Sequence, residues 1–225
     1  MVKNQFNWGI IVAAGRGKRF GGQKQFALVK NKPLLLYAVR PFEICSEVTG
    51  YVVVTNKSKI EAVSNLLRRY RSQKLLAVIA GGKERMDSVE QGLLNLPEKG
   101  YVAIHDGVRP LLKPEMLTQG FWACRRHPAV TFGIPIVDTV KKVNNRNQIV
   151  RTIDRSGLFA IQTPQFFSLK IIRRAYAYAR AKNLTATDDC ALVEQLKITP
   201  QLLLGTPWNI KVTTKADLLL CQALL

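Results

Sequence analysis

The chain has 225 residues, 47% of them hydrophobic, and a formal net charge of +19 from 34 basic and 15 acidic side chains. It is long enough to bury a substantial core, as one domain or as one domain with an appendage. The positive charge attracts phosphorylated partners, but the basic residues are dispersed and no zinc-ligand spacing or aromatic RNA-binding signature accompanies them. A basic surface around an anion-binding enzyme is therefore favoured over a nucleic-acid-binding protein.

The cysteine spacing and the N-terminal segment bear on the cellular location of the protein. Cys45, Cys124, Cys190 and Cys221 are scattered without paired spacing, which argues against a disulfide framework or a zinc site. The apolar run after the polar residues 1–8 is too short to span a membrane or to form a secretory segment. We therefore expect a soluble cytoplasmic protein with no membrane association.

The first predicted strand, residues 9–14, opens into a loop with the composition of a phosphate-binding site. Gly15 and Gly17 allow a tight turn that brings backbone N–H groups close to an anion, and Lys18, Arg19 and Lys24 add positive charge. A glycine turn with solvated charges would give the same local pattern by chance. The loop by itself indicates phosphate binding without identifying the ligand.

Two better-known phosphate loops do not match. A dinucleotide fingerprint requires a third small residue where this chain has Phe20, and an acidic residue after the second strand, where Asn56 and Lys57 stand. A P-loop requires Gly-Lys-Ser/Thr, and neither Gly17 nor Gly22 stands in that frame. The sequence thus disfavours a dehydrogenase and a P-loop ATPase.

Predicted strands and helices alternate along most of the chain. Short apolar runs predict strands at residues 9–14, 51–55, 75–79, 101–105, 129–134 and 201–204. Apolar residues at helical spacing predict helices at residues 33–43, 57–70, 87–95 and 114–126. This order implies βαβ crossovers, hence an α/β fold with three layers and a mostly parallel sheet. Ligands of such sheets lie beyond the carboxyl ends of the strands, so the loops after Ala14, Ile79, His105 and Ile134 are the candidate sites.

Residues 137–153 interrupt this alternation. Polar and apolar residues alternate over 137–143 and 148–153 around an asparagine-rich turn, which predicts a β-hairpin. An isolated hairpin is marginally stable in water, so this one is expected to pack against another surface, and a second subunit is the simplest candidate. We therefore predict one domain over residues 1–225 with a dimerisation arm at about 137–155.

Two further loops carry chemistry. Gly81 and Gly82 form a turn before a helix whose first turn includes Ser88, where exposed backbone groups could recognise a base. Asp106 ends a strand beside the phosphate loops and could hold Mg²⁺, although an Asp before Gly is also a common turn former. His105 is interpreted as a packed strand residue and not as a base.

Seven motifs follow one another along the chain. They are Ala13-Ala14-Gly15 with Arg19 and Lys24; Gly81-Gly82 with Glu84-Arg85 and Asp87-Ser88; His105-Asp106 with Arg109-Pro110; Asp138-Thr139-Val140-Lys141; Asp154-Arg155-Ser156-Gly157-Leu158; Gln162-Thr163-Pro164-Gln165-Phe166; and Asn209-Ile210-Lys211-Val212-Thr213. Together, and in this order, they resemble the 2-C-methyl-D-erythritol 4-phosphate cytidylyltransferase family over nearly the whole chain. The resemblance implies a homodimer with a Rossmann-like nucleotidyltransferase fold. It further implies an enzyme of non-mevalonate isoprenoid synthesis that joins CTP to a polyol phosphate and releases pyrophosphate.

The resemblance also assigns residues to roles. It places the CTP-binding positions at Ala13, Ala14, Gly15, Gly17, Gly81, Gly82 and Ser88. It makes Arg19, Lys24, Arg155 and Lys211 the catalytic cations, with Mg²⁺ or another divalent ion on Asp106. It makes Arg109, Thr139 and Thr163 substrate-binding residues, with Thr139 and Arg155 contributed by the partner subunit's arm.

Three alternatives remain at this point. A pentitol-phosphate cytidylyltransferase would share the CTP-binding half, although the arm and the motif at 154–158 favour methylerythritol phosphate. A basic nucleic-acid-binding protein would fit the charge but leaves the ordered loops unexplained. Thr187-Asp188-Asp189 resembles a family motif, and it equally fits a helix N-cap followed by acidic residues in the first turn.

Overall fold

A twisted seven-stranded sheet forms the centre of the part of the chain that the computed structural model describes, residues 6–15, 17 and 20–225. Its order is β11-β7-β10-β6-β1-β4-β5, so β1 is flanked by β4 and β6. Six of the strands match the predicted ones to within about two residues at each end. The strands are β1 (Asn7–Val12), β4 (Gly50–Thr55), β5 (Leu75–Ala80), β6 (Tyr101–Asp106), β7 (Ala129–Pro135), β10 (Phe159–Ser168) and β11 (Gln201–Leu204).

Strand β10 makes the sheet mixed. It runs antiparallel to both of its neighbours, β6 and β7, whereas the other pairs are parallel. Its pairing with β7 shifts register between Gln162 and Gln165, an irregularity of the kind often found beside functional sites. The expectation of a mostly parallel sheet is confirmed, and β10 is an element that the sequence analysis did not predict.

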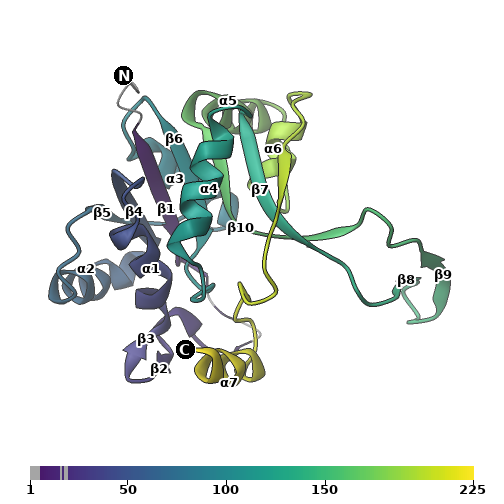
Figure 1. Ribbon diagram of the computed structural model, residues 1–225, viewed down its shortest axis with the longest axis horizontal. Helices are drawn as coiled ribbons and strands as arrows, with labels where there is room; N and C mark the ends of the chain where they lie inside the picture. The colour runs from purple at the N-terminus through teal and green to yellow at the C-terminus, as the bar shows by residue number, and fades with distance from the viewer. Residues whose placement is uncertain (1–5, 16, 18–19) are drawn as a thin grey trace.

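Helices cover both faces of the sheet, which confirms the three layers (Figure 1). Helices α1 (Leu34–Ile44), α2 (Ile60–Arg69) and α4 (Pro114–Cys124) pack on the face that Ile11 and Val53 present. Helices α3 (Arg85–Leu94), α5 (Leu169–Ala181) and α6 (Asp189–Glu194) pack on the face of Ile10 and Val52. Because successive strand residues point to opposite faces, continuous apolar runs supply both cores at once.

A smaller apolar cluster supports the loops below the sheet. It joins Val29 of β2 (Leu28–Val29) to Val108, Val212 and Cys221, the last of these on α7 (Lys215–Leu224). The short strand β3 (Lys32–Pro33) pairs with β2, and the 3₁₀ helices η1 (Lys24–Phe26) and η2 (Lys57–Lys59) complete the elements. Thr214 and Asp217 form a reciprocal capping box at the start of α7.

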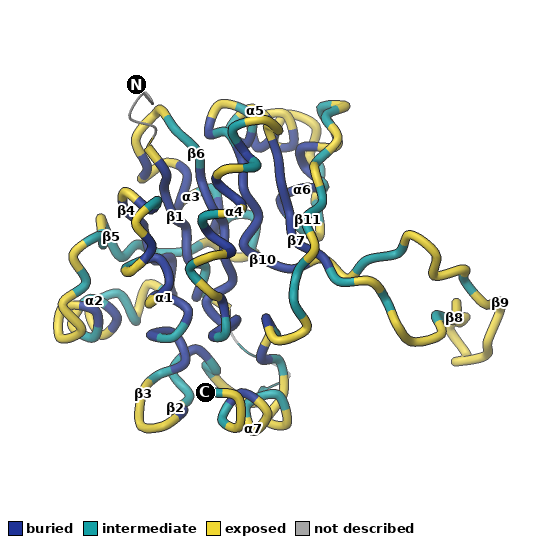
Figure 2. Tube along the Cα trace, viewed as in Figure 1, coloured by how far each residue is buried: buried dark blue, intermediate teal, exposed yellow. Residues whose placement is uncertain are grey.

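The predicted hairpin is confirmed as strands β8 (Val140–Val143) and β9 (Ile149–Ile153), which pair with each other outside the main sheet. It extends well away from the body of the protein, and most of its residues are exposed (Figures 1 and 2). Val143, Ile149 and Val150 are 52%, 66% and 57% exposed. The arm thus leaves aliphatic side chains uncovered by its own chain.

The structure also bears on the expectations about the cysteines and about membrane-spanning helices. The four cysteines are buried free thiols, as their scattered spacing predicted. Within the described ranges, every helix is too short or too polar to cross a membrane.

Candidate active site

A pocket of about 520 Å³ lies at the carboxyl ends of β1, β4 and β6. Strand β1 lies between the other two, at the point where the strand order of the sheet reverses, which is where ligands of such sheets bind. Three of the four candidate loops meet there, after β1, β5 and β6, whereas the loop after β7 leads into the arm. The pocket brings together nine of the predicted site residues: Ala13, Ala14, Gly15, Gly17, Lys24, Gly82, Ser88, Asp106 and Lys211.

The first loop is fixed by hydrogen bonds from Gln25, a residue to which the sequence analysis gave no role. The buried Gln25 amide donates to the carbonyl oxygens of Ala13 at 2.8 Å and Gly15 at 3.3 Å. Gly17 has a φ of +65°, and a Cβ there would lie 1.8 Å from the carbonyl oxygen of Gly22, so this position requires glycine. Arg19, which the sequence analysis assigned to the triphosphate, lies outside the described residues.

The second loop packs against the first. Ser88 Oγ accepts from the Gly82 N–H at 3.2 Å and donates to the Glu84 carbonyl oxygen at 3.1 Å. A Cβ on Gly82 would lie 2.2 Å from Cβ of Asp87, and one on Gly81 would lie 2.7 Å from Cβ of Ala14. The absence of a Cβ on Gly81 therefore allows the two loops to pack against each other behind the pocket lining. Gly82 lines the pocket, so its backbone is accessible from it.

Asp106 is the buried carboxylate of the pocket, and it contacts two cations. Its Oδ2 lies 2.6 Å from Nζ of Lys211, and its Oδ1 accepts from Nε of Arg85 at 3.2 Å. Burial alone would raise the pKa of Asp106, but the charges of Arg85 and Lys211 outweigh it and hold the pKa well below its usual range. The carboxylate is therefore ionised at neutral pH.

This donor set fits Mg²⁺ in the mode that phosphate enzymes use. Among the described residues no group of three or more His, Cys, Asp or Glu side chains lies together, so the protein does not supply a complete cage. Mg²⁺ is commonly held by one or two carboxylates, with water and substrate phosphates completing its octahedron. Asp106 beside a glycine-rich loop is suited to that role.

Behind Asp106, a buried hydrogen-bonded network fixes the end of β6. Nε2 of His105 lies 3.1 Å from the Arg109 carbonyl oxygen, and Nδ1 lies 3.2 Å from Thr163 Oγ. Thr163 Oγ also accepts from the Asp106 N–H at 3.0 Å. Burial lowers the pKa of His105 to about 4, so the imidazole is neutral. His105 is thus a packed strand residue, as predicted.

Two predicted substrate residues belong to this buried layer and do not line the pocket. Arg109 and Thr163 are 9% and 7% exposed. The Arg109 guanidinium donates to the Asn209 carbonyl oxygen at 2.6 Å, and the Asn209 amide donates to the Thr163 carbonyl oxygen at 2.8 Å. Their contacts within the chain therefore orient the strand ends beneath Asp106.

The predicted arm residues do not reach the pocket of their own chain. Thr139 and Arg155 are both exposed and flank the paired strands of the arm. The Arg155 guanidinium donates to the Val137 carbonyl oxygen, which ties the two legs of the arm together. Both side chains are therefore on the surface of the single chain, outside its own pocket.

The sequence analysis also left other lining residues unassigned. Asn56 follows β4, Arg85 begins α3, and Val108 follows β6. Arg85 stood within a quoted motif, so the signal for it was present without a role. Asn56 was used only to exclude a dinucleotide site, although its position after a parallel strand could have identified it.

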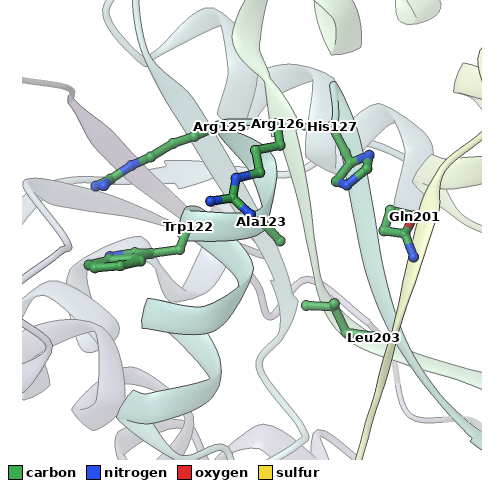
Figure 3. Close-up of a pocket in the computed structure, with 7 residues that line it drawn as sticks. All are labelled: Trp122, Ala123, Arg125, Arg126, His127, Gln201 and Leu203. Atoms are coloured by element: carbon green, nitrogen blue, oxygen red, sulfur yellow. The ribbon is translucent and has the colours of Figure 1, made fainter.

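A second hollow of about 530 Å³ has different chemistry. It lies between the C-terminal end of α4, with the turn that follows it, and strand β11, and Figure 3 shows its lining residues. Its basic and aromatic side chains include Trp122 with the Arg125 guanidinium 5.2 Å from its ring centre. It has neither a carboxylate nor a glycine loop, so the pocket around Asp106 remains the candidate active site.

The comparisons with known proteins point to one family. The family model described as IspD: 2-C-methyl-D-erythritol 4-phosphate cytidylyltransferase matches residues 8–225. Proteins of that name from Dehalococcoides mccartyi and Alkaliphilus metalliredigens are 38% and 39% identical, over 100% and 96% of this chain and 98% and 91% of theirs. These matches cover all of the motifs that carried the resemblance.

Solved structures give the same result for the fold. The structure described as 4-diphosphocytidyl-2C-methyl-D-erythritol synthase from Anaerococcus prevotii has a TM-score of 0.86 at 28% identity, covering 98% of each chain. The 2-C-methyl-D-erythritol 4-phosphate cytidylyltransferase of Thermus thermophilus has a TM-score of 0.80 at 27% identity, covering 96% of each chain. The chain belongs to the 2-C-methyl-D-erythritol 4-phosphate cytidylyltransferase family, the nucleotidyltransferases of the non-mevalonate isoprenoid pathway.

Proposed function

We propose that the pocket around Asp106 is where this enzyme transfers CMP from CTP to 2-C-methyl-D-erythritol 4-phosphate. The observation that carries the proposal is the ionised Asp106 carboxylate beside two glycine loops and Lys211. In this reaction a phosphate oxygen of the acceptor forms a bond to the α-phosphorus of CTP, and the bond from that phosphorus to the bridging oxygen breaks. The electron pair leaves with pyrophosphate.

The chain's own groups would neutralise the two anionic reactants and align them. We assign the cytosine, ribose and phosphates to the loops that contain Ala13, Ala14, Gly15, Gly17, Gly81, Gly82 and Ser88. Lys24 and Arg19 would stabilise the triphosphate charge, and Mg²⁺ on Asp106 would add positive charge at the same oxygens. Lys211 has a side chain that is 40% exposed, so it can move from Asp106 towards the reacting phosphates. The acceptor phosphate is itself the nucleophile, so no Ser, Cys or His side chain is needed.

The arm supports a homodimer with shared active sites. Its exposed aliphatic residues need a partner surface, and Thr139 and Arg155 do not reach the pocket of their own chain. We propose that they enter the partner's site, where Arg155 would hold the acceptor phosphate through a planar two-point contact. Arg109 and Thr163 remain predictions for that site. We further propose one cytoplasmic domain over 1–225, with the arm at about 137–155.

Pyrophosphate release from CTP tests the proposal directly. We expect Mg²⁺-dependent release with methylerythritol phosphate and much slower release with a pentitol phosphate, the substrate of the nearest alternative. Salt-dependent binding to random DNA in the same preparation would measure the charge-driven alternative. Faster release with the pentitol phosphate would overturn the substrate assignment, whereas DNA binding without any release would overturn the proposed site.

A further inference from the structure

A line of alternating charges leads from the pocket into the core. Lys211 pairs with Asp106, Asp106 with Arg85, and Arg85 Nη2 lies 2.8 Å from Oδ2 of Asp189. The other oxygen of Asp189 accepts a 2.7 Å hydrogen bond from the Tyr176 hydroxyl. Arg85 thus bridges two carboxylates, one lining the pocket and one 1% exposed.

The two cations on Asp106 differ in their freedom to move. Burial would lower the pKa of Arg85, but Asp189 and Asp106 outweigh it and raise the pKa, so the guanidinium stays charged. Its Nε donates a hydrogen bond to Asp106 and its Nη2 forms a 2.8 Å ion pair with Asp189, so the guanidinium is held between two carboxylates. Lys211 is the more exposed of the two and has one ion pair within the described part of the chain, so it is the cation that can be exchanged.

Asp189 is itself held by residues of two neighbouring elements. Its N–H donates to Gln165 Oε1 of β10 at 3.1 Å, and Tyr176 of α5 binds its side chain. Asp188 caps α6 by accepting from the Ala191 N–H at 2.9 Å. The two acids of the Thr187-Asp188-Asp189 motif therefore have separate tasks: Asp188 begins the helix, and Asp189 faces Arg85.

We propose that Asp189 and Arg85 are positioning residues for the transfer reaction, acting as a buried brace on Asp106. The brace holds Oδ1, and with Lys211 displaced from Oδ2 the carboxylate would be able to hold a divalent ion, which would supply positive charge to the triphosphate. This inference rests on the proposed function and assigns a role to residues that the sequence analysis left without one. The brace acts through Asp106 and does not touch the substrate.

The carboxylate of Asp189 is essential to this arrangement. The positive charge of Arg85 is shared between the carboxylates of Asp106 and Asp189. With a neutral side chain at position 189, Arg85 would direct its full charge at Asp106 and would compete with a divalent cation for that carboxylate. A lysine at position 85 would keep the charge, but its single ammonium group cannot reproduce the fixed fork between the carboxylates.

Metal binding to the enzyme–CTP complex tests the brace. We expect Asp189→Asn and Arg85→Lys each to weaken Mn²⁺ binding, measured by electron paramagnetic resonance, by about tenfold, as other supporting contacts at metal sites do. The Mg²⁺ concentration for half-maximal turnover should rise by a similar factor. The KM for methylerythritol phosphate should stay unchanged, since the brace does not contact that substrate.

Two further variants make the outcome decisive. Tyr176→Phe removes one hydrogen bond to Asp189 and keeps the ring, so it tests the same direction of effect if Asp189→Asn does not fold. Arg125→Lys is the matched control, because Arg125 also lies 2.8 Å from a carboxylate oxygen, of Glu47, and has a similarly exposed side chain. The control should leave Mn²⁺ binding unchanged.

Folded brace variants that lose thermal stability but bind Mn²⁺ like the wild type would overturn the proposal and leave a structural role. The proposed function can fail independently. A wild-type protein that releases no pyrophosphate from CTP and methylerythritol phosphate would refute that function. In the same preparation, a shift in Mn²⁺ binding by Asp189→Asn would still support the brace.

Discussion

The nucleotide pocket and the arm differ in how many of their side chains have partners within the chain. In the pocket, Asp106 has partners on both carboxylate oxygens, and Gln25 fixes the first loop through two carbonyl groups. On the arm, Ile149 and Val150 are more than half exposed, and β8 and β9 pair only with each other in the described chain. The contacts that shape the pocket lie within one chain, whereas the aliphatic side chains of the arm are left uncovered by the described residues of that chain.

This difference separates two kinds of inference. The charges and loop geometry of the pocket follow from contacts of one chain, so they predict chemistry directly. The arm predicts an assembly, because exposed aliphatic residues on a projecting hairpin are stabilised when another surface covers them. Experiments that change one region at a time can show whether catalysis depends on both.

The strongest test of the pocket is Asp106→Asn, which keeps the size of the side chain and removes its charge. We expect turnover to fall by roughly a thousandfold, because the side chain would no longer hold the divalent ion that neutralises the triphosphate. Pyrophosphate release across a Mg²⁺ titration measures the effect, with circular dichroism as the check on folding. Near-normal turnover at limiting Mg²⁺ would remove Asp106 from the metal site.

Lys24→Ala tests the phosphate loop. We expect turnover to fall by about a hundredfold, the size typical of one lost electrostatic contact in the transition state. Lys32→Ala is a suitable control, since Lys32 lies 5.9 Å from the centre of the Tyr70 ring, outside the pocket lining. A rise in the KM for CTP with unchanged turnover would instead show that Lys24 binds ground state and transition state equally.

Mixed dimers compare the two regions within one assembly. Arg155→Ala and Lys211→Ala should each be nearly inactive as homodimers. In the isolated heterodimer, one site would have both residues intact and the other would lack both, so activity should return to about half of the wild-type value. A stable heterodimer without recovery would show that Arg155 serves its own subunit.

The smallest expected effect concerns the support below the pocket. Thr213 and Thr214 donate hydrogen bonds to Asp217 and lower its pKa to about 2, below its usual value near 4. Its contribution to stability is therefore present above about pH 4 and is lost as the pH falls towards 2. At pH 7, Asp217→Asn should lower the melting temperature by about 2–4 °C.

Thermal melts at several acidic pH values would check this linkage. The difference between Asp217→Asn and the wild type should shrink between pH 4 and pH 2, because the wild-type carboxylate also becomes neutral there. A difference that stays constant over this range would assign the stability loss to something other than the ionised cap. Turnover at pH 7 and moderate temperature should change little.

The sequence predicted those parts of the sheet and its loops whose signals are local. Buried apolar runs such as Tyr51–Thr55 and glycine turns such as Gly81–Gly82 are local signals, so the strands and the loops after them were identifiable. Strand β10 was not predicted, because Pro164 and the polar residues around it hide the apolar pattern, and proline usually argues against an interior strand. Helix α6, with six residues, is too short to show a helical period.

The ion pairs and burial of the site residues could not be predicted from local sequence patterns. Arg85 and Asp189 lie far apart in the sequence, and their contact depends on how α3 and α6 pack on the same face of the sheet. The burial of Arg109 and Thr163 likewise depends on β10 lying beside β6. Motif order could assign these residues to a site without showing which of them line it.

The neutral His105 has a consequence for proton availability in the site. A carbonyl oxygen can only accept, so Nε2 carries the imidazole proton towards Arg109, and Nδ1 must accept from the Thr163 hydroxyl. That hydroxyl has one proton, and its oxygen already accepts from the Asp106 N–H. A phosphate group arriving at Thr163 would therefore have to compete with a buried imidazole for that single proton, so in this arrangement the Thr163 hydroxyl offers its ligand no spare proton.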